Sequence, residues 1–493
     1  MKIGVEPYDG MNADQISSQL QVFWDLEHLG ITENYPPFRE IDDPVLKGFR
    51  SSARLQEGRY VVRLPWDTEK SHRLADNKTL ALQRLGHITK KLLLDSALME
   101  EYDMTIRQYL LNDHAEHVRE PESPVSGPIY YMPHHTVIRR DRETTKVRIV
   151  FDASSKMPGE VSLNETLHAG PDLNSDVLDL LMQFRAHQIA LTADVEKAFL
   201  HIALDPCDRD ALRFLWYETT PKASQPLPRV ETWRMTRVPF GAKSSPFLLA
   251  VSITHHLQSA AAQCPETAAL LSTHFYVDDL VVAVGSSQEA SLLYRQARDI
   301  LLEAGMKLVK WTSNDMKLRT LFQDEGTTSM STTPLRKVLG LNWDIDSDEI
   351  QLSVKSLTEF LERRADTKRY VLQAVSRTYD PLGYVAPYVI TAKILLQRIW
   401  LAKLQWDDQL PEALMNTWHR WCQEVTMLSD FRVPRRLSGA SAPLQESTQS
   451  LHVFSDASTK AYGAAVYLVL QSDDGNIEIS IVLAKARVPP SEP

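Results

Sequence analysis

The spacing of apolar side chains predicts a mostly helical beginning for the chain. Within residues 1–120, Leu82, Leu85 and Ile88 recur at intervals close to those of one helix face. A short strand-like run, GRYVVRLPW, interrupts this region. The following stretch, REPESPVSGPIYYMP, is rich in Pro, Ser and Gly, so a domain boundary is predicted near residue 120.

Strands and helices alternate irregularly across residues 121–345. The run IALTADV alternates as a strand does, and AFLHIAL is predicted to continue that strand. Helices are predicted at 177–184 and 245–262, HFYVDDLVVAVG is predicted to be a hairpin, and a helix is predicted to end at Gly305. Because the alternation lacks the rhythm of a parallel barrel, the predicted fold class is α+β.

The rest of the chain is predicted to contain a helical region, a linker and a region of strands. A hairpin is predicted in KVLGLNWDIDSDEIQLSV, and the wider region 346–433 is predicted to be helical. Residues 434–450 are polar and are predicted to form a linker. Residues 451–493 contain two strand-like runs, LHVFSDASTKAYGAAVYLVL and NIEISIVLAKAR.

Length and composition narrow the class of protein. A chain of 493 residues is long enough for roughly three domains, and 43% hydrophobic with 24% charged residues is typical of globular proteins. Three widely spaced cysteines argue against a disulfide framework and a clustered zinc site. No apolar run approaches the ~18 residues of a membrane span, and the first residues do not resemble a signal peptide. We therefore expect an intracellular protein that is neither secreted nor bound to a membrane.

The charge distribution is uneven. A net charge of −10 argues against a nucleic-acid partner, yet two strips are basic. His135–Arg148 has five Arg or Lys against two acids, and Gly305–Arg319 has four against one, so each carries +3. Such strips are ordinarily solvated faces, and charge alone leaves nucleic-acid binding open.

Three carboxylates are the strongest chemical signal. Asp278 and Asp279 interrupt the apolar run FYVDDLVVAV, and Asp194 interrupts the predicted strand LTADV. Like charges held beside a buried sheet repel each other unless a cation neutralises them. Carboxylate oxygens on two neighbouring strands suit Mg²⁺, and a pair of such ions can promote phosphoryl transfer. We therefore expect a site for two Mg²⁺ ions, for which Mn²⁺ could substitute.

The order of further motifs gives a specific resemblance. KVRIVFDAS, LTADVEKAFL, VPFGAKSSPFLL, YVDD, KLVKW and VLGLNW follow one another along the chain. In this order they resemble a reverse transcriptase, with Asp194 and the YVDD aspartates as metal ligands. The resemblance implies a right-hand polymerase, with fingers and palm at 121–345 and a helical thumb and connection at 346–433.

The same resemblance implies roles for five further residues. Arg148 would lie against the incoming nucleotide, and Phe199 would exclude a ribose 2′-hydroxyl. Gly241 would shape the nucleotide pocket, while Lys307 or Lys310 would lie near the triphosphate. VLGLNW resembles the segment that grips the primer.

One departure from the family concerns the nucleotide pocket. Many reverse transcriptases have Gln before the glycine of the third motif, where this chain has Phe240.

The lineage suggested is the Pol polyprotein of Pao/BEL long-terminal-repeat retrotransposons. GRYVVRLPW, TYDPLGYVAPYVITAKILLQRIW and FSDASTKAYGAAVY resemble segments of that lineage, so the likeness covers almost the whole chain. The last segment resembles the start of a ribonuclease H domain, in which Asp456 would be a metal ligand. Because few acids follow Asp456, this module is expected to be truncated and inactive, and the chain to be a fragment of a polyprotein.

The expected function is therefore RNA-directed DNA polymerase, acting on an RNA or DNA template with a primer and on deoxynucleoside triphosphates. The expected location is the cytoplasm, or a virus-like particle if the element is intact, and the oligomeric state is left open. One alternative is an inactive nucleic-acid-binding remnant of a polyprotein. Another is a retrotransposon aspartic peptidase, although the chain has no Asp-Thr-Gly or Asp-Ser-Gly triplet.

Overall fold

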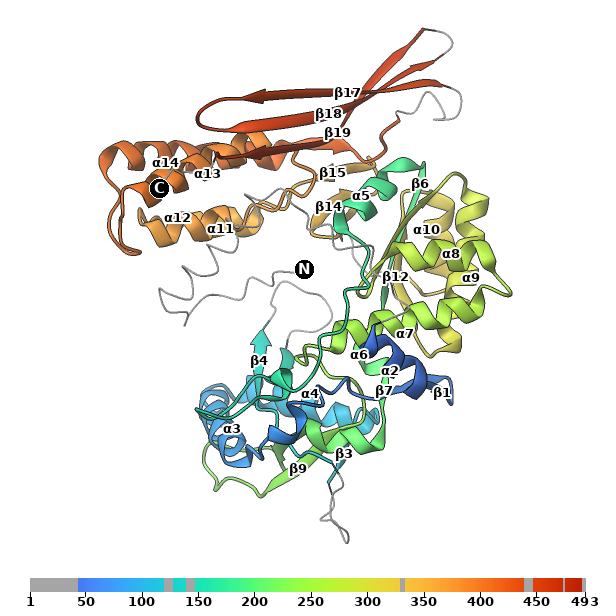
Figure 1. Ribbon diagram of the computed structural model, residues 1–493, viewed down its shortest axis with the longest axis vertical. Coiled ribbons are helices and arrows are strands. Elements are labelled where there is room, and N and C mark those ends of the chain that lie inside the picture. The colour runs from blue at the N-terminus through green and yellow to red at the C-terminus, as the bar shows by residue number, and fades with distance from the viewer. Residues whose placement is uncertain are drawn as a thin grey trace.

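The computed structural model of the chain combines α-helices with several small, mainly antiparallel sheets. Figure 1 shows a lower body, a central sheet with its helices on the right, and a group of helices beneath a long three-stranded sheet at the top. The mixed helix and strand content agrees with the predicted α+β class. The structure describes residues 43–118, 127–138, 147–328, 333–438, 447–472 and 475–489.

The lower body packs two long helices against a sheet and a hairpin. Asp95 starts the helix α4, because its side chain accepts a hydrogen bond from Leu98 N at 3.1 Å. The helix then buries Met99, Tyr102 and Ile106. The sheet has the order β3–β9–β8, and β4 pairs with β5. The elements are α3 Lys78–Leu92, α4 Ser96–Leu111, β3 Ala115–His117, β4 His134–Ile138, β5 Val147–Phe151, β8 Arg213–Tyr217 and β9 Val230–Met235.

A smaller sheet joins the lower body to the centre of the molecule. Its order is β1–β2–β7, and β2 runs parallel to β7 although about 140 residues separate them in sequence. The described part of the first region contains helices and three short strands, of which β2 lies in the predicted strand-like run GRYVVRLPW. The elements are α2 Pro44–Ser52, β1 Arg54–Gln56, β2 Arg59–Val62 and β7 Ala203–Leu204.

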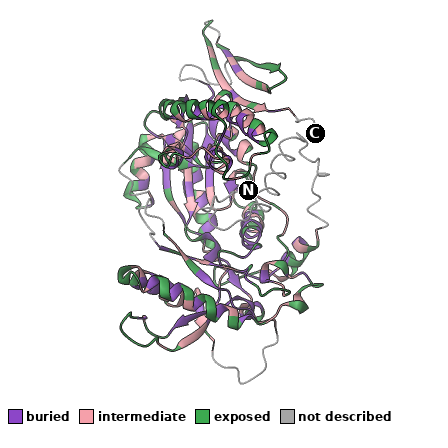
Figure 2. Cartoon of the chain, turned by 90° about the vertical axis from the view of Figure 1, so that its left-hand side faces the viewer, coloured by how far each residue is buried: buried purple, intermediate pink, exposed green. Residues whose placement is uncertain are grey.

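The central sheet is antiparallel throughout, in the order β10–β11–β6–β12. Its middle strands are almost wholly apolar and buried, and the flanking helices cover them (Figure 2). Helix α9 ends just before Gly305, as predicted, where φ is +70°. The strands are β6 Ile189–Val195, β10 Phe275–Tyr276, β11 Asp279–Val284 and β12 Leu308–Ser313, and the helices are α5 Val177–Ala186, α7 Ser245–Ala260, α8 Pro265–His274, α9 Ser287–Glu303 and α10 Met316–Asp324.

The prediction that AFLHIAL continues the strand β6 is wrong. Lys197 has φ +49°, a left-handed conformation that stops β6, and the helix α6 (Ala198–His201) follows. The turn buries Phe199 and Leu200 against the core.

The upper part contains a second small sheet, four helices and the long terminal sheet. The terminal strands pair antiparallel in the order β17–β18–β19. The first strand-like run is divided between β17 and β18 and the second corresponds to β19, but β17 begins at Ser447, inside the predicted linker. None of the helices in the described ranges has the length and apolar character needed to cross a bilayer. The strands are β13 Leu335–Val338, β14 Leu341–Asp344, β15 Glu349–Gln351, β16 Arg432–Pro434, β17 Ser447–Ala457, β18 Tyr462–Ser472 and β19 Ile477–Arg487, and the helices are α11 Lys355–Leu361, α12 Lys368–Val375, α13 Ala386–Leu401 and α14 Glu412–Glu424.

The beginning of the predicted linker 434–450 is a structural joint. Arg435 is fully buried, and its Nε and one terminal nitrogen donate to the two Asp348 carboxylate oxygens at 2.7 and 2.9 Å. The same guanidinium donates to the carbonyls of His187 and Gln188 at 2.9 and 2.8 Å. This arginine therefore ties the β14–β15 turn to the end of α5, which the polar composition of the segment did not indicate.

Replacing Arg435 by methionine is expected to destabilise the fold. The substitution leaves Asp348 and several carbonyls without their donor, which should cost about 3 kcal/mol in the free energy of unfolding measured with urea. The control is Arg432→Met, since Arg432 is exposed and bonds only nearby carbonyls, and a change below about 0.5 kcal/mol is expected. Equal effects of the two substitutions would contradict this role.

Candidate metal centre and nucleotide site

The register of the central sheet places two carboxylates opposite each other. Asp279 of β11 and Asp194 of β6 are Cα partners, and Val195 N donates to Asp278 O at 2.9 Å. That bond identifies Asp194 and Asp279 as a pair without direct backbone hydrogen bonds, in which the Cα atoms lie only about 4.5 Å apart. Their side chains therefore point to the same face of the sheet at the shortest separation that a ladder allows.

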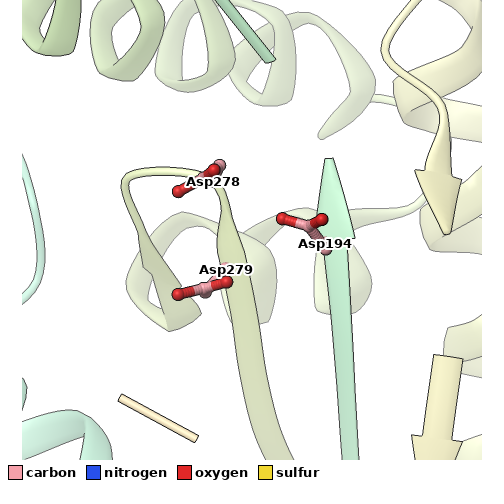
Figure 3. Close-up of side chains that lie close together, drawn as sticks. All are labelled: Asp194, Asp278 and Asp279. Carbon is pink, nitrogen blue, oxygen red and sulfur yellow. The ribbon is translucent and has the colours of Figure 1, made fainter. Parts of the chain in front are cut away.

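Asp278 completes a three-carboxylate group. It occupies the turn between β10 and β11, beside Asp279 and facing the end of β6 (Figure 3). One oxygen from each of Asp194, Asp278 and Asp279 lies within 4.8 Å of the others, and all three residues are half-buried. Like charges this close destabilise a sheet unless a cation lies between them, and three hard oxygen donors fit Mg²⁺ or Mn²⁺.

Other acids crowd the same hairpin. Burial, followed by the charges of Asp172, Asp176 and Asp279, raises the pKa of Tyr276 above its ordinary value. Tyr276 directly precedes the turn and pairs with Asp279 across the hairpin. The surroundings of the turn are therefore electronegative, as a site for divalent cations requires.

The turn that carries Asp278 is strained. Tyr276 pairs with Asp279, so Val277 and Asp278 are the two central residues, and Val277 has φ +58°. A positive φ at only the first central residue is the pattern of a type II′ turn, where glycine is preferred. A β-branched residue in this conformation costs about 1–3 kcal/mol, so the surrounding structure must hold it in place.

The two candidate lysines, Lys307 and Lys310, differ in their contacts with the carboxylates. Lys310 lies in a bulge of β12, has φ +56°, and places Nζ 2.5 Å from Asp194 Oδ2. Bulges are common beside active sites, where they redirect a side chain. The Lys307 carbonyl accepts a hydrogen bond from Glu196 N at 2.9 Å, and its side chain is exposed. Lys310 is thus the lysine that reaches the carboxylates.

Phe199 lies on α6, just beyond the end of β6, and is 8% exposed. Its ring meets the ring of Phe240 edge to face, with centroids 4.7 Å apart. Phe240 itself is 43% exposed. The residue that departs from the usual family sequence is therefore the packing partner of the predicted gate.

Gly241 brings its loop against the strand that carries Arg148. Gly241 has φ +107°, and a Cβ added there would lie 2.0 Å from Phe151 O of β5. Asn164 fixes this contact, since it donates to Gly241 O at 3.1 Å and accepts from Lys243 N at 2.8 Å. Arg148 is exposed on β5. Asn164 was not predicted, because no motif distinguishes it from an ordinary loop asparagine.

Asp456 is an exposed residue of β17, which belongs to the terminal sheet at the top of Figure 1 and not to the central sheet. Its side chain accepts a hydrogen bond from Ala457 N at 2.9 Å, and its Cα partner is Gly463. Within the described ranges it belongs to no group of three potential metal ligands. The predicted inactivity of the ribonuclease H-like segment remains a prediction.

Comparison with known families identifies the class of protein. Residues 142–320 match the family model for reverse transcriptase (RNA-dependent DNA polymerase). This segment contains β5, the central sheet and all three clustered aspartates. The match supports the reverse transcriptase that the order of the motifs predicted.

A second match specifies the lineage. Residues 367–493 match the Pao retrotransposon-like RNaseH-like domain, so the two matches together support a reverse transcriptase of a Pao/BEL-type retrotransposon. This confirms the resemblance drawn from the motifs. The second match begins within the helical region 346–433, before the predicted start of the ribonuclease H-like segment at 451. No relative among curated proteins matches the sequence.

Solved structures confirm the polymerase fold. The foamy viral protease-reverse transcriptase dRH in complex with double-stranded DNA aligns with a TM-score of 0.51 and 14% identity, covering 79% of this chain and 55% of that one. The foamy viral protease-reverse transcriptase in complex with double-stranded DNA aligns with a TM-score of 0.50 and 14% identity, covering 79% and 66%. The chain therefore spans between about half and two thirds of these proteins.

Substituting Gly241 by alanine is expected to destabilise the protein. The new methyl group would collide with the backbone of β5, so the melting temperature should fall by several degrees, equivalent to about 2 kcal/mol. Gly159→Ala is the matched control, because Gly159 also has a positive φ, +86°, but has no atom within 4 Å of the added Cβ. If both variants melt at the same temperature, the close contact is not the reason for glycine at 241.

Proposed function

We propose that this chain is an RNA-directed DNA polymerase that adds deoxynucleotides to a primer. The observation that carries the proposal is the convergence of Asp194, Asp278 and Asp279 at one end of the central sheet. In the reaction, the primer 3′-hydroxyl forms a bond to the nucleotide's α-phosphate and the bond to pyrophosphate breaks. Two Mg²⁺ ions, when bound, would activate this hydroxyl and stabilise the charge on the leaving oxygen.

The side chains around the carboxylates support the proposal. Asp194, Asp278 and Asp279 would hold the ions. Lys310 already contacts Asp194, so its charge lies where the triphosphate would approach, while Arg148 would contact the nucleotide from β5. Lys307 is proposed as a weaker contact with phosphate, because its side chain is exposed at the edge of the site. Gly241 would let the loop after β9 form one wall of the pocket.

Phe199 is proposed as the residue that selects the sugar. It follows Asp194 by five positions, on the short helix after β6, and its edge-to-face contact with Phe240 fixes the ring. A rigid aromatic ring beside the nucleotide leaves no room for a 2′-hydroxyl, whereas the exposed Phe240 would extend the apolar wall.

The proposed substrates are a primed RNA or DNA template and deoxynucleoside triphosphates. The similar foamy viral structures are described in complex with double-stranded DNA, and the two basic strips of this chain would contact a phosphate backbone. We assign fingers and palm to 121–345, thumb and connection to 346–433 and the ribonuclease H-like segment to 451–493. A cytoplasmic location is proposed, because reducing conditions suit its three free cysteines.

Asparagine at position 278 is expected to abolish primer extension. Asp278→Asn removes a negative ligand but keeps the shape, so the rate with Mg²⁺ should fall by roughly 10³-fold while template-primer binding is unchanged. The control is Asp324→Asn, at an exposed carboxylate at the end of α10, which should leave the rate unaltered. Primer extension that survives Asp278→Asn would exclude the proposed metal centre, whereas an inactive parent protein that still binds duplex would favour the nucleic-acid-binding remnant.

Shortening Phe199 is expected to relax sugar selection. Phe199→Ala should lower the preference for deoxynucleotides over ribonucleotides by roughly 10- to 100-fold, since one pocket contact is removed. The measurement is kcat/KM for each nucleotide in single-nucleotide primer extension. Phe199→Tyr keeps the ring and should retain the preference. If Phe199→Ala prefers deoxynucleotides over ribonucleotides as strongly as the parent protein does, Phe199 is not the residue that selects the sugar.

A further inference from the structure

The strained turn is held by a residue from a distant loop. The Val277 N–H donates to Asn174 Oδ1 at 3.0 Å. As the first central residue of the turn, Val277 has an N–H that the β10–β11 pairing does not use, so this bond satisfies it from outside the hairpin. Asn174 lies in the connection before α5, 103 residues earlier in the sequence.

Asn174 is itself fixed in orientation. Its Nδ2 and its backbone N–H both donate to Asp172 Oδ1, at 2.8 and 3.1 Å. Because the donor end of the amide is taken by a carboxylate, the acceptor end must face the turn. Ser175 Oγ donates to Thr273 O at 2.8 Å, which anchors the same loop to the end of α8.

We infer that Asn174 is a positioning residue of the metal centre: it holds the peptide before Asp278 in the strained turn that aims the Asp278 carboxylate at Asp194. This inference rests on the proposed polymerase function. Two features hold Val277 at positive φ, namely this hydrogen bond and the packing of the partly buried Val277 side chain against the hydrophobic core. Without the bond, the backbone can return to a negative φ, which reorients the next peptide and moves Asp278 away from its partners.

The test substitutes Asn174 by alanine in the full chain and uses two measurements. The first is Mn²⁺ binding in the absence of nucleotide, followed by electron paramagnetic resonance; the dissociation constant should rise about tenfold. The second is primer extension; kcat should fall about 10- to 100-fold while KM for the template-primer stays within about twofold. Thermal unfolding of each variant verifies that the fold is retained.

Two further variants distinguish a positioning role of Asn174 from a general loss of order in the loop before α5. Ser175→Ala removes the neighbouring anchor without touching the turn, so Mn²⁺ binding and kcat should stay within about twofold of the parent. Val277→Gly removes the strain, because glycine adopts a positive φ without steric cost. In that background, Asn174→Ala should change either quantity by less than about threefold.

The outcomes are distinct. The inference is overturned, with the proposed function intact, if the parent extends primers and Asn174→Ala matches it in both measurements. It is also overturned if Asn174→Ala is equally damaging with Val277 and with glycine at 277, or if Ser175→Ala has the same effect. A parent that neither extends primers nor binds Mn²⁺ overturns the proposed function and this inference together.

Discussion

Repulsion among three carboxylates is the constraint around which the centre of this molecule is organised. Asp194 and Asp279 face each other across adjacent strands at the closest spacing of an antiparallel ladder, and Asp278 adds a third charge at the turn. Positive charge close to the carboxylates reduces this repulsion, and Lys310 already contacts Asp194. The buried apolar residues of β6 and β11 surround the group, and Val277 holds the turn in a strained conformation with φ +58°.

The remaining structure supports the site from both sides. The helix α6 turns the chain just after the end of β6, and it carries Phe199 five residues beyond Asp194. The tight approach of Gly241 to β5 connects the loop after β9 to the lower body. From above, Arg435 joins α5 to the β14–β15 turn through Asp348. The three-carboxylate group thus lies where three parts of the chain are held together by contacts that are distant in sequence.

Sequence patterns predicted the helices and strands better than the turns and tertiary contacts that connect them. The strand ending at Asp194 and the YVDD hairpin were predictable, because a charged residue inside a buried apolar run is conspicuous. The end of the strand β6 shortly after Asp194 was not predictable. It depends on the left-handed backbone conformation of Lys197, and lysine has no preference for that conformation. The bulge that directs Lys310 to Asp194 and the bond from Asn174 to Val277 also depend on tertiary contacts, which no local pattern encodes. Arg435 was assigned to a polar linker because composition does not report burial.

Diffraction from crystals grown with Mn²⁺, recorded at a wavelength where manganese scatters anomalously, tests the central claim most directly. The account predicts an anomalous peak in contact with carboxylate oxygens of Asp194 and Asp278, with Lys310 displaced from Asp194. Manganese bound elsewhere on the chain, with no peak between these two residues, would contradict it.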